Sequence, residues 1–346
     1  MVTRKVRVLI VDDSLFIREF ISSGLMEDTG IEVVGKAVDA FDARDKILEL
    51  HPDVMTLDIN MPQMDGIDFL SKLLPQYQLP VVVVSSISGR VFDALNAGAV
   101  DFVTKANLKD EAERRRFISE LTAKIKIASI AKVTRKHTAS AAGLPLPGRE
   151  IAKPSASGII AIGASTGGTE ATQTILQGLG RDLPGIVVVQ HMPPVFTRLY
   201  AERLNAICSM EVKEAENGDT ILPGRVLIAQ GGLHMRVARK AMGGLFVECA
   251  EGEKVSGHCP SVDVLFSSIA KLKGLKSIGI ILTGMGSDGA KGLLEMKKAG
   301  ARTLGQDKQT CVVYGMPAVA EKIGAVELQL PIQDIAGKVY EWQRRL

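Results

Sequence analysis

Short apolar runs alternate with amphipathic stretches along the first part of the chain. The apolar runs cover residues 6–13, 31–37, 53–59, 80–86 and 99–105. Apolar residues recur at helical spacing over 15–27, 40–50, 65–74, 90–98 and 111–128. Runs that stay apolar without alternation are typical of strands buried on both faces of a parallel sheet. The pattern therefore predicts an α/β domain over residues 1–127, a five-stranded, doubly wound parallel sheet.

The pattern breaks over residues 128–157 and then resumes. This segment is rich in Ala, Ser, Pro and basic residues and has no sustained periodicity, which predicts a flexible linker. Beyond it we expect strands over 158–163, 186–190, 225–229, 245–249, 278–283, 301–304 and 325–328. We expect helices over 168–178, 195–207, 261–273, 289–299, 316–323 and 332–343. Residues 158–346 are thus predicted to form a second α/β domain, a mostly parallel sheet with a β-rich excursion within 209–257.

Composition and charge exclude several classes of protein. The chain has 346 residues, of which 46% are hydrophobic, so both halves can bury a core. A net charge of +3 is too small to predict binding to nucleic acid, and no apolar run is long enough for membrane insertion. The four cysteines, with no CxxC spacing, fit a reducing, cytoplasmic location, and we expect each to be a small core residue: Cys208, Cys249, Cys259 and Cys311.

Acidic residues gather at strand ends in the first domain. Asp12 and Asp13 follow the first strand and Asp58 ends the third, and these strands are neighbours in a sheet of this kind. Three close carboxylates repel one another unless a cation lies between them, and an all-oxygen site suits Mg²⁺. Ser85 and Lys105 end the next two strands on the same rim. The set suits transfer of a phosphoryl group to Asp58, with the cation and Lys105 neutralising its oxygens.

The segments VDDS, LDINMPQMDG, VVSS and DFVTK resemble those of response-regulator receiver domains, over residues ~5–125. The resemblance implies phosphorylation of Asp58 by a partner histidine kinase. It also implies that Asn60 joins the three acids at the Mg²⁺ site, and that Ser85, Phe102 and Lys105 form the switch. One departure is Ala106, which stands where such domains usually carry proline after the lysine.

Three strands of the second domain end at residues suited to acyl-transfer chemistry. Ser165 lies in a G-x-S-x-G turn, His191 ends VVVQH, and Asp288 follows a strand and glycines. In open α/β sheets the carboxyl ends of the strands form the active crevice, so we expect these groups to meet as nucleophile, base and orienting acid. The backbone amides of Thr166 and Met285 are candidates for an oxyanion site. His234 and His258 are rival histidines that could instead bind substrate.

An alternative use of the last loop is dinucleotide binding. Gly284–Gly289 fits G-x-G-x-x-G between a strand and a helix, and Asp307 lies about 20 residues further on, as in that fingerprint. Against it, Asp288 would repel a pyrophosphate, and the strand is not the first of its domain. No ligand cluster in this domain has metal spacing, so we expect no metal or other cofactor there.

The segments GASTGGTEA, VVVQHMPP, LTGMGSDGA and YGMPAVA resemble the chemotaxis protein-glutamate methylesterase family. With the receiver in front, the resemblance spans nearly the whole chain. It implies a phosphorylation-regulated hydrolase that removes γ-methyl esters from glutamates of methyl-accepting chemoreceptors and deamidates receptor glutamines. A chemotaxis histidine kinase would be its phosphodonor. Two further alternatives are a receiver-controlled binding module without catalysis and a DNA-binding output domain, which a missing basic recognition helix disfavours.

Overall fold

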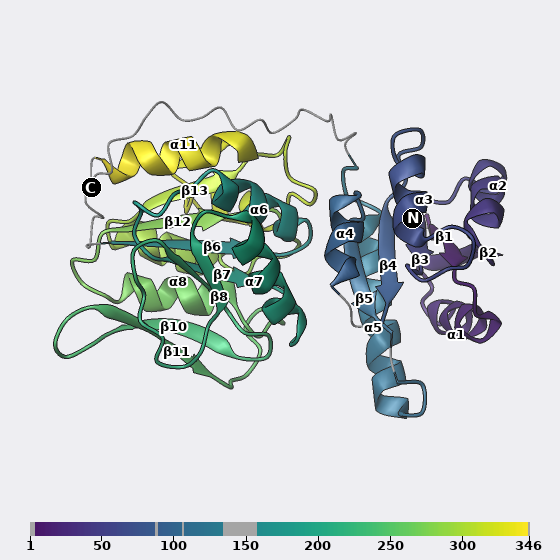
Figure 1. Cartoon of the computed structure of the whole chain (residues 1–346), viewed down its shortest axis with the longest axis horizontal. Helices are drawn as coiled ribbons and strands as arrows, with labels where there is room; N and C mark the ends of the chain where they lie inside the picture. Colours follow the sequence, from purple (N-terminus) through teal and green to yellow (C-terminus); the bar gives the residue numbers. More distant parts are fainter. Residues whose placement is uncertain (1–3, 87–88, 106, 134–157, 345–346) are drawn as a thin grey trace. The chain divides into compact units, whose positions relative to one another are not determined.

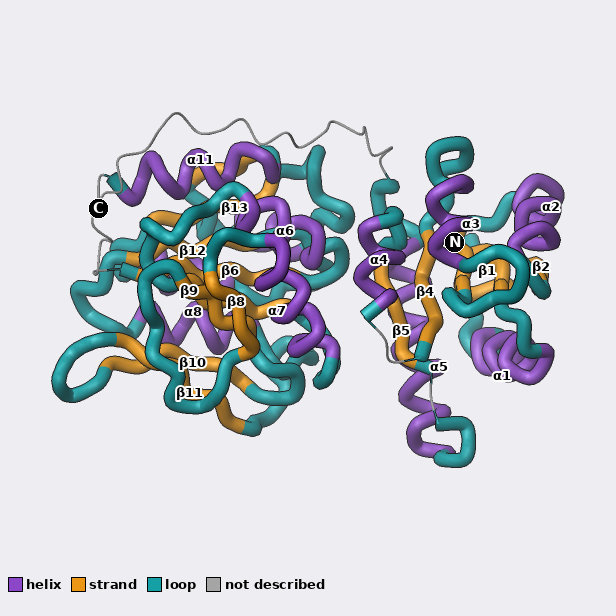
Figure 2. The backbone as a smooth tube through the Cα atoms, in the orientation of Figure 1, coloured by secondary structure: helices purple, strands orange, loops and turns teal. Residues whose placement is uncertain are grey.

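The computed structural model describes residues 4–86, 89–105, 107–133 and 158–344. The chain divides into two compact units, Met1–Ser140 and Ala141–Leu346. Both are layered α/β structures in which helices cover the faces of one main sheet (Figures 1 and 2). Among the described residues, no helix combines the length and apolar character needed to cross a bilayer.

The first unit is a five-stranded sheet with strand order β2-β1-β3-β4-β5, and all four pairings are parallel. Its strands are β1 (Val6–Val11), β2 (Ile31–Ala37), β3 (Val54–Leu57), β4 (Val81–Ser85) and β5 (Asp101–Thr104). Its helices are α1 (Leu15–Leu25), α2 (Ala40–Leu50), α3 (Gly66–Leu73), α4 (Arg90–Asn96) and α5 (Glu111–Ala128). This is the predicted doubly wound sheet.

Capping side chains explain where several of these helices begin. The side chains of Ser14, Asp39, Asp65 and Asp110 each accept a backbone N–H from the first turn of the helix that follows. The central strands β3 and β4 are wholly buried, as expected for a parallel sheet covered on both faces, whereas the edge strand β2 is mostly half-buried. Because β1 lies beside β3, the loops that follow these two strands meet at one edge of the sheet.

The second unit contains a seven-stranded sheet with strand order β14-β13-β12-β6-β7-β9-β8, again parallel throughout. The strands are β6 (Ile159–Ala164), β7 (Ile186–Gln190), β8 (Glu211–Glu214), β9 (Arg225–Ile228), β12 (Ser277–Ile281), β13 (Arg302–Gln306) and β14 (Leu328–Leu330). The helices are α6 (Gly168–Gln177), α7 (Phe196–Ile207), α8 (Val262–Ala270), α9 (Ala290–Lys298), α10 (Met316–Lys322) and α11 (Ile332–Gln343). The chain runs outward from β6 to β7 on one side and later returns to β12 on the other side of β6. A crevice is expected at such a switch point.

Of the predicted β-rich excursion, β8 and β9 join the main sheet, and the rest forms an antiparallel hairpin outside that sheet. It consists of β10 (His234–Arg239) and β11 (Leu245–Ala250). Figure 1 shows the hairpin beside α8. Val237 and Val247 belong to the same buried cluster as Val262 and Phe266 of α8. The hairpin therefore fixes the position of α8, whose N-terminus lies at the candidate site.

Several details differ from the sequence-based expectation. Residues 211–214 and 234–239 form strands that were not among those expected. The last strand lies at 328–330 rather than 325–328, because Ala325 and Val326 belong to the turn after α10 and only Leu328–Leu330 pair with β13. Of the four cysteines only Cys311 is buried, whereas Cys208, Cys249 and Cys259 are partly exposed, and none forms a disulfide. The predicted linker falls mostly on residues 134–157, which lie outside the described part of the chain.

Candidate active site

Ser165 and His191 follow neighbouring strands at the carboxyl edge of the second sheet. The register pairs Ala164 of β6 with Gln190 of β7, so the residues that follow them emerge side by side. The His191 N–H donates to the carbonyl of Ala164 over 3.1 Å. The Gln190 Nε2 group donates to the carbonyl of Ser165 over 2.9 Å, which ties the two strand ends together.

Glycines allow the sharp turn on which Ser165 lies. Gly167 has a φ of +76° and caps α6, a conformation that favours glycine. A Cβ on Gly168 would lie 2.3 Å from Gln190 Oε1. Ser165 itself is partly exposed, and its N–H donates to the carbonyl of Thr283 over 3.0 Å. The turn therefore presents a hydroxyl directly before the N-terminus of α6, where backbone N–H groups favour negative charge.

His191 and Asp288 form a buried pair. Their Nε2 and Oδ2 atoms are 2.8 Å apart, and the two side chains are 6% and 1% exposed. The same carboxylate accepts hydrogen bonds from the Ser261 hydroxyl at 2.7 Å and from the N–H groups of Val262 and Asp263 at 2.8 and 3.1 Å. Burial alone would raise the pKa of Asp288, but the hydrogen bonds from His191, Ser261 and Val262 lower it below the usual range.

The other ring nitrogen of His191, Nδ1, is buried and has no hydrogen-bond partner among the described residues. With Nε2–H donating to Asp288, Nδ1 carries the lone pair that a general base needs. The Ser165 hydroxyl and Nδ1 of His191 are not hydrogen-bonded to each other. Such bonds are often long or poorly aligned before substrate binds.

The loop after β12 lies directly against Ser165. A Cβ on Gly284 would lie 2.6 Å from the Ser165 Cβ, so only glycine permits this approach. The next residue, Met285, is 42% exposed, and its N–H donates no hydrogen bond within the described chain. Thr166 is buried, and its carbonyl accepts from the Thr283 hydroxyl over 3.0 Å. Both predicted oxyanion residues therefore adjoin Ser165.

The two rival histidines occupy different places. His258 stacks on His191, with ring centroids 3.7 Å apart and planes inclined by 8°. His234 is 1% exposed, and both of its ring nitrogens are engaged: Nδ1 accepts the Ser261 N–H at 3.2 Å and Nε2 lies 2.8 Å from the Glu253 carbonyl. The expectation that His234 could contact substrate is therefore wrong, because its ring is enclosed by backbone.

The sequence patterns missed the residues that hold the triad candidates in place. Ser261 is the N-cap of α8 and bonds Asp288, Asp263 starts the same helix, and Gln190 bonds the Ser165 carbonyl. A serine just before VDVLF is a recognisable helix-start signal, so the cap was predictable. Its contact with Asp288, across the fold, was not.

The dinucleotide alternative loses both of its acidic residues to other partners. Asp288 binds His191 and the α8 N-terminus, and the Asp307 carboxylate accepts from the N–H and hydroxyl of Thr310 at 2.9 and 2.6 Å. Asp307 is thus used within its own turn. A ribose-binding acid would have to point toward the glycine loop.

The predicted acidic pocket of the first unit is formed. Carboxylate oxygens of Asp12, Asp13 and Asp58 lie within 4.8 Å of one another. Lys105 Nζ lies 2.7 Å from Asp58 and 2.8 Å from Asp12. Burial raises the pKa of Asp58 despite the bond from Lys105. Burial opposes the charge on Lys105, but its bonds to Asp12 and Asp58 raise its pKa. An all-oxygen set with one exposed member fits Mg²⁺.

The other predicted receiver residues differ in their surroundings. The Ser85 hydroxyl is buried, without a hydrogen-bond partner in the described chain. Phe102 is 4% exposed. The Asn60 N–H donates to Asp58 at 3.3 Å, and the exposed Asn60 side chain accepts from Arg90 at 3.4 Å. The side chain of Asn60 is thus engaged away from the acids, and any contribution to a cation must come from its backbone carbonyl. Ala106 lies outside the described residues.

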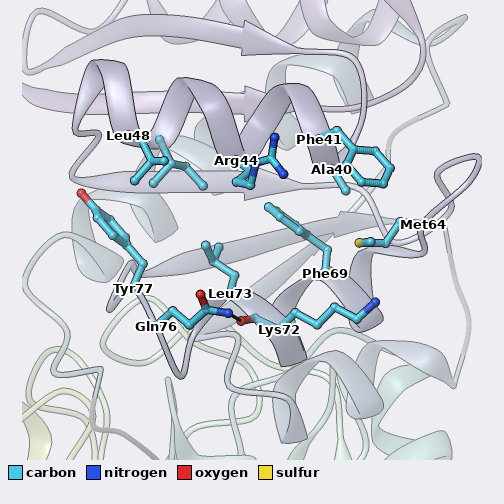
Figure 3. A pocket seen from close by; sticks show the side chains of 11 residues that line it. Ala40, Phe41, Arg44, Leu48, Met64, Phe69, Lys72, Leu73, Gln76 and Tyr77 are labelled. Carbon is cyan, nitrogen blue, oxygen red and sulfur yellow. Dashed lines mark hydrogen bonds between the residues drawn. The ribbon is translucent and has the colours of Figure 1, made fainter.

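A separate groove lies between α2 and α3 on the first unit (Figure 3). It encloses about 450 Å³, and its lining includes the apolar side chains of Phe41, Leu48 and Phe69 beside the charged Arg44 and Lys72. None of the predicted site residues lines it. The groove is therefore distinct from the phosphoacceptor pocket.

Comparison with known proteins relates each unit to a family. Residues 160–339 match the CheB methylesterase family, and residues 8–115 match the response regulator receiver domain. A protein-glutamate methylesterase/protein-glutamine glutaminase of Syntrophomonas wolfei is 56% identical over 338 residues, 98% of each chain. A protein of the same name from Syntrophotalea carbinolica is 50% identical over 346 residues, again 98% of each.

A solved structure matches the second unit. The CheB methylesterase catalytic domain of Thermotoga maritima has a TM-score of 0.52 and 39% identity, and the match covers 54% of this chain and 99% of that one. The chain belongs to the CheB methylesterase family and carries a response regulator receiver domain.

Proposed function

We propose that the protein is a protein-glutamate methylesterase and protein-glutamine deamidase, controlled by phosphorylation, that acts on chemoreceptors in chemotactic adaptation. The observation that carries the proposal is the buried His191–Asp288 pair beside Ser165, at the edge of a sheet whose sequence matches this family. The names of its relatives support the same activity.

The chemistry follows from the free nitrogen of His191. Ser165 Oγ attacks the carbonyl carbon of the glutamyl methyl ester, and its proton passes to Nδ1 of His191. Asp288 holds Nε2–H and stabilises the imidazolium that forms. The C–O bond to methoxide then breaks, Nδ1–H protonates the leaving oxygen, and methanol departs. Water attacks the glutamyl-enzyme and gives one proton to Nδ1. The bond to Ser165 Oγ then breaks as Nδ1–H returns that proton to Oγ, and the glutamate leaves as a carboxylate after losing its remaining proton to solvent.

The negative charge that develops on the carbonyl oxygen needs hydrogen-bond donors within reach of that oxygen. The N–H of Met285 is the donor that the geometry favours, because its loop contacts Ser165 and this N–H has no partner in the described chain. Deamidation uses the same steps with ammonia as the leaving group. The same site would therefore hydrolyse both the methyl ester of glutamate and the side-chain amide of glutamine.

The receiver supplies the control. Asp58 would take the phosphoryl group from a histidine kinase, with Mg²⁺ held by Asp12, Asp13 and Asp58 and the charge shared by Lys105. Methyl-accepting chemoreceptors would be the substrate proteins and a chemotaxis histidine kinase the phosphodonor. We place the protein in the cytoplasm, because its four cysteines form no disulfide, as is usual in a reducing compartment.

The direct test is methanol release from methylated receptor, with and without a small phosphodonor. Wild type should release methanol faster with phosphodonor, and Ser165→Ala should release none while still incorporating phosphate. Normal turnover by Ser165→Ala would contradict the proposal. Trapping of Ser165 by a fluorophosphonate would separate an enzyme from a binding module.

A further inference from the structure

We propose that His258 is a positioning residue for the catalytic base, and that it acts by stacking on one face of the His191 ring. The inference deepens the proposed function and rests on it. It is carried by the near-parallel contact of the two rings, 3.7 Å between centroids and 8° between planes.

The His191 ring is held at one point by hydrogen bonding. Nε2 is fixed by Asp288, whereas Nδ1 has no partner in the described chain. A ring held at one atom can still tilt about that bond, and tilting would move Nδ1 out of line with the Ser165 hydroxyl. A flat group packed on its face removes this freedom. Base catalysis depends on such alignment, since small displacements cost large factors in rate.

The backbone presents His258 rigidly. Val255 and His258 exchange two backbone hydrogen bonds of 3.0 Å across a tight turn. The two central residues, Ser256 and Gly257, have φ values of +52° and +84°, as in a two-residue hairpin turn. Three residues later Ser261 bonds Asp288. One short segment therefore supports both partners of the pair, the imidazole face through His258 and the carboxylate through Ser261.

His258 is suited to support rather than to proton transfer. Its ring nitrogens make no hydrogen bond within the described chain. The charged groups near it are His191, Asp288 and Lys254. Burial, and then the neighbouring His191, lower the pKa of His258 to about 4. Two stacked imidazole rings repel each other when both are charged. A neutral His258 therefore leaves His191, which is bonded to Asp288, to receive the proton of Ser165.

The test measures how fast a fluorophosphonate probe labels Ser165 in the full-length protein, because this reaction needs His191 but no receptor. His258→Phe keeps a flat ring without nitrogens, and His258→Leu keeps volume without a flat face. Val255→Ala is the matched control in the same turn. We expect His258→Leu to label roughly tenfold more slowly, and His258→Phe and Val255→Ala to stay near wild type.

A second readout separates positioning from a merely structural role. With receptor substrate, His258→Leu should lower kcat and leave KM unchanged, at a melting temperature close to that of His258→Phe. Equal labelling by His258→Leu and wild type would overturn the inference, as would slow labelling by His258→Phe. A rise in KM in both variants would mean that His258 binds substrate instead. Failure of wild type itself to be labelled at Ser165 would refute the proposed function rather than this inference alone.

Discussion

Asp288 accepts hydrogen bonds from the start of α8, and Asp263 of α8 in turn accepts one from the start of α9. Asp288, just before α9, accepts the N–H groups of Val262 and Asp263 at the start of α8. Asp263, in the first turn of α8, accepts the N–H of Gly292 in α9 at 2.7 Å. Burial raises the pKa of Asp263, and the nearby Asp288 charge adds to this. The orienting acid of the triad is thus fixed by a reciprocal cap between two helices.

Removing the Asp263 side chain should loosen this arrangement. We expect Asp263→Ala to destabilise the second unit by about 1–2 kcal/mol, the usual cost of losing a helix cap, and to lower kcat as well. Asp263→Asn keeps an oxygen acceptor for Gly292 and should cost less. The single tryptophan, Trp342, is buried in the second unit, so its fluorescence during urea unfolding follows that unit.

Asp334 offers a control for this measurement. It is an exposed acid in the first turn of α11. Asp334→Ala should leave the unfolding midpoint nearly unchanged. If Asp263→Ala and Asp334→Ala unfolded alike, the reciprocal cap would not stabilise the fold.

Substitutions of Asp288 and Asp307, the two acids of the dinucleotide alternative, should have very different effects on activity. Asp288→Asn places an amide NH₂ against the donors of His191, Ser261 and the α8 backbone, so the imidazole loses its tautomer and its orientation. By analogy with other triads we expect kcat to fall by about 10³–10⁴-fold. Asp307→Asn should leave methanol release unchanged, because within the described chain the Asp307 carboxylate bonds only to Thr310 of its own turn. Loss of activity in Asp307→Asn, together with cofactor binding, would restore the dinucleotide alternative.

The sequence pattern could predict the triad residues at the strand ends, but it could not predict the residues that hold them in place. Ser165, His191 and Asp288 each follow a run of apolar residues, and the parallel-sheet pattern by itself places such ends on one rim. His234, His258 and Ser261 come from the hairpin and the segment after it. Their places depend on the packing of Val237 and Val247 against α8, a contact between distant segments that no periodicity records.

The same contrast holds in the receiver. The pairing of β1 with β3 brings Asp12 and Asp58 together as the sequence pattern predicted. The direction of the Asn60 side chain, toward Arg90, depends on where α4 packs, and the pattern of the loop does not contain that information.

Phosphorylation should be lost when the acceptor is changed. Asp58→Asn removes the attacking carboxylate, and we expect neither acid-labile phosphate on the protein nor stimulation of methanol release by a small phosphodonor. Basal release should persist. Asp53 lies at the opposite end of β3 and pairs with Arg4 at 2.9 Å, so Asp53→Asn is the matched control and should be phosphorylated normally. Stimulation that persisted in Asp58→Asn would assign the acceptor to another residue.

The pH dependence of stability should report on His258. Its pKa falls from an ordinary value of 6.5 to about 4 in the folded protein. Between these values the unfolded chain binds the proton more readily than the folded one, so stability is lost as the pH falls through this window. Asp288 acts in the same direction but at lower pH. Its pKa is lowered from 3.8, so its contribution is lost only as the pH falls below that value, outside the window.

His258→Phe should therefore flatten the curve. Relative to the variant, wild type should lose roughly 1–3 kcal/mol of unfolding free energy between about pH 7 and pH 4.5, measured by Trp342 fluorescence in urea. His191, Asp288 and Lys254 face His258 and remain in both proteins, so their own titration largely cancels in the difference. Parallel curves for wild type and His258→Phe would show that His258 titrates normally in the fold. In that case the stacked ring would be solvated enough to accept a proton beside His191, and it could not serve as a neutral support for the base.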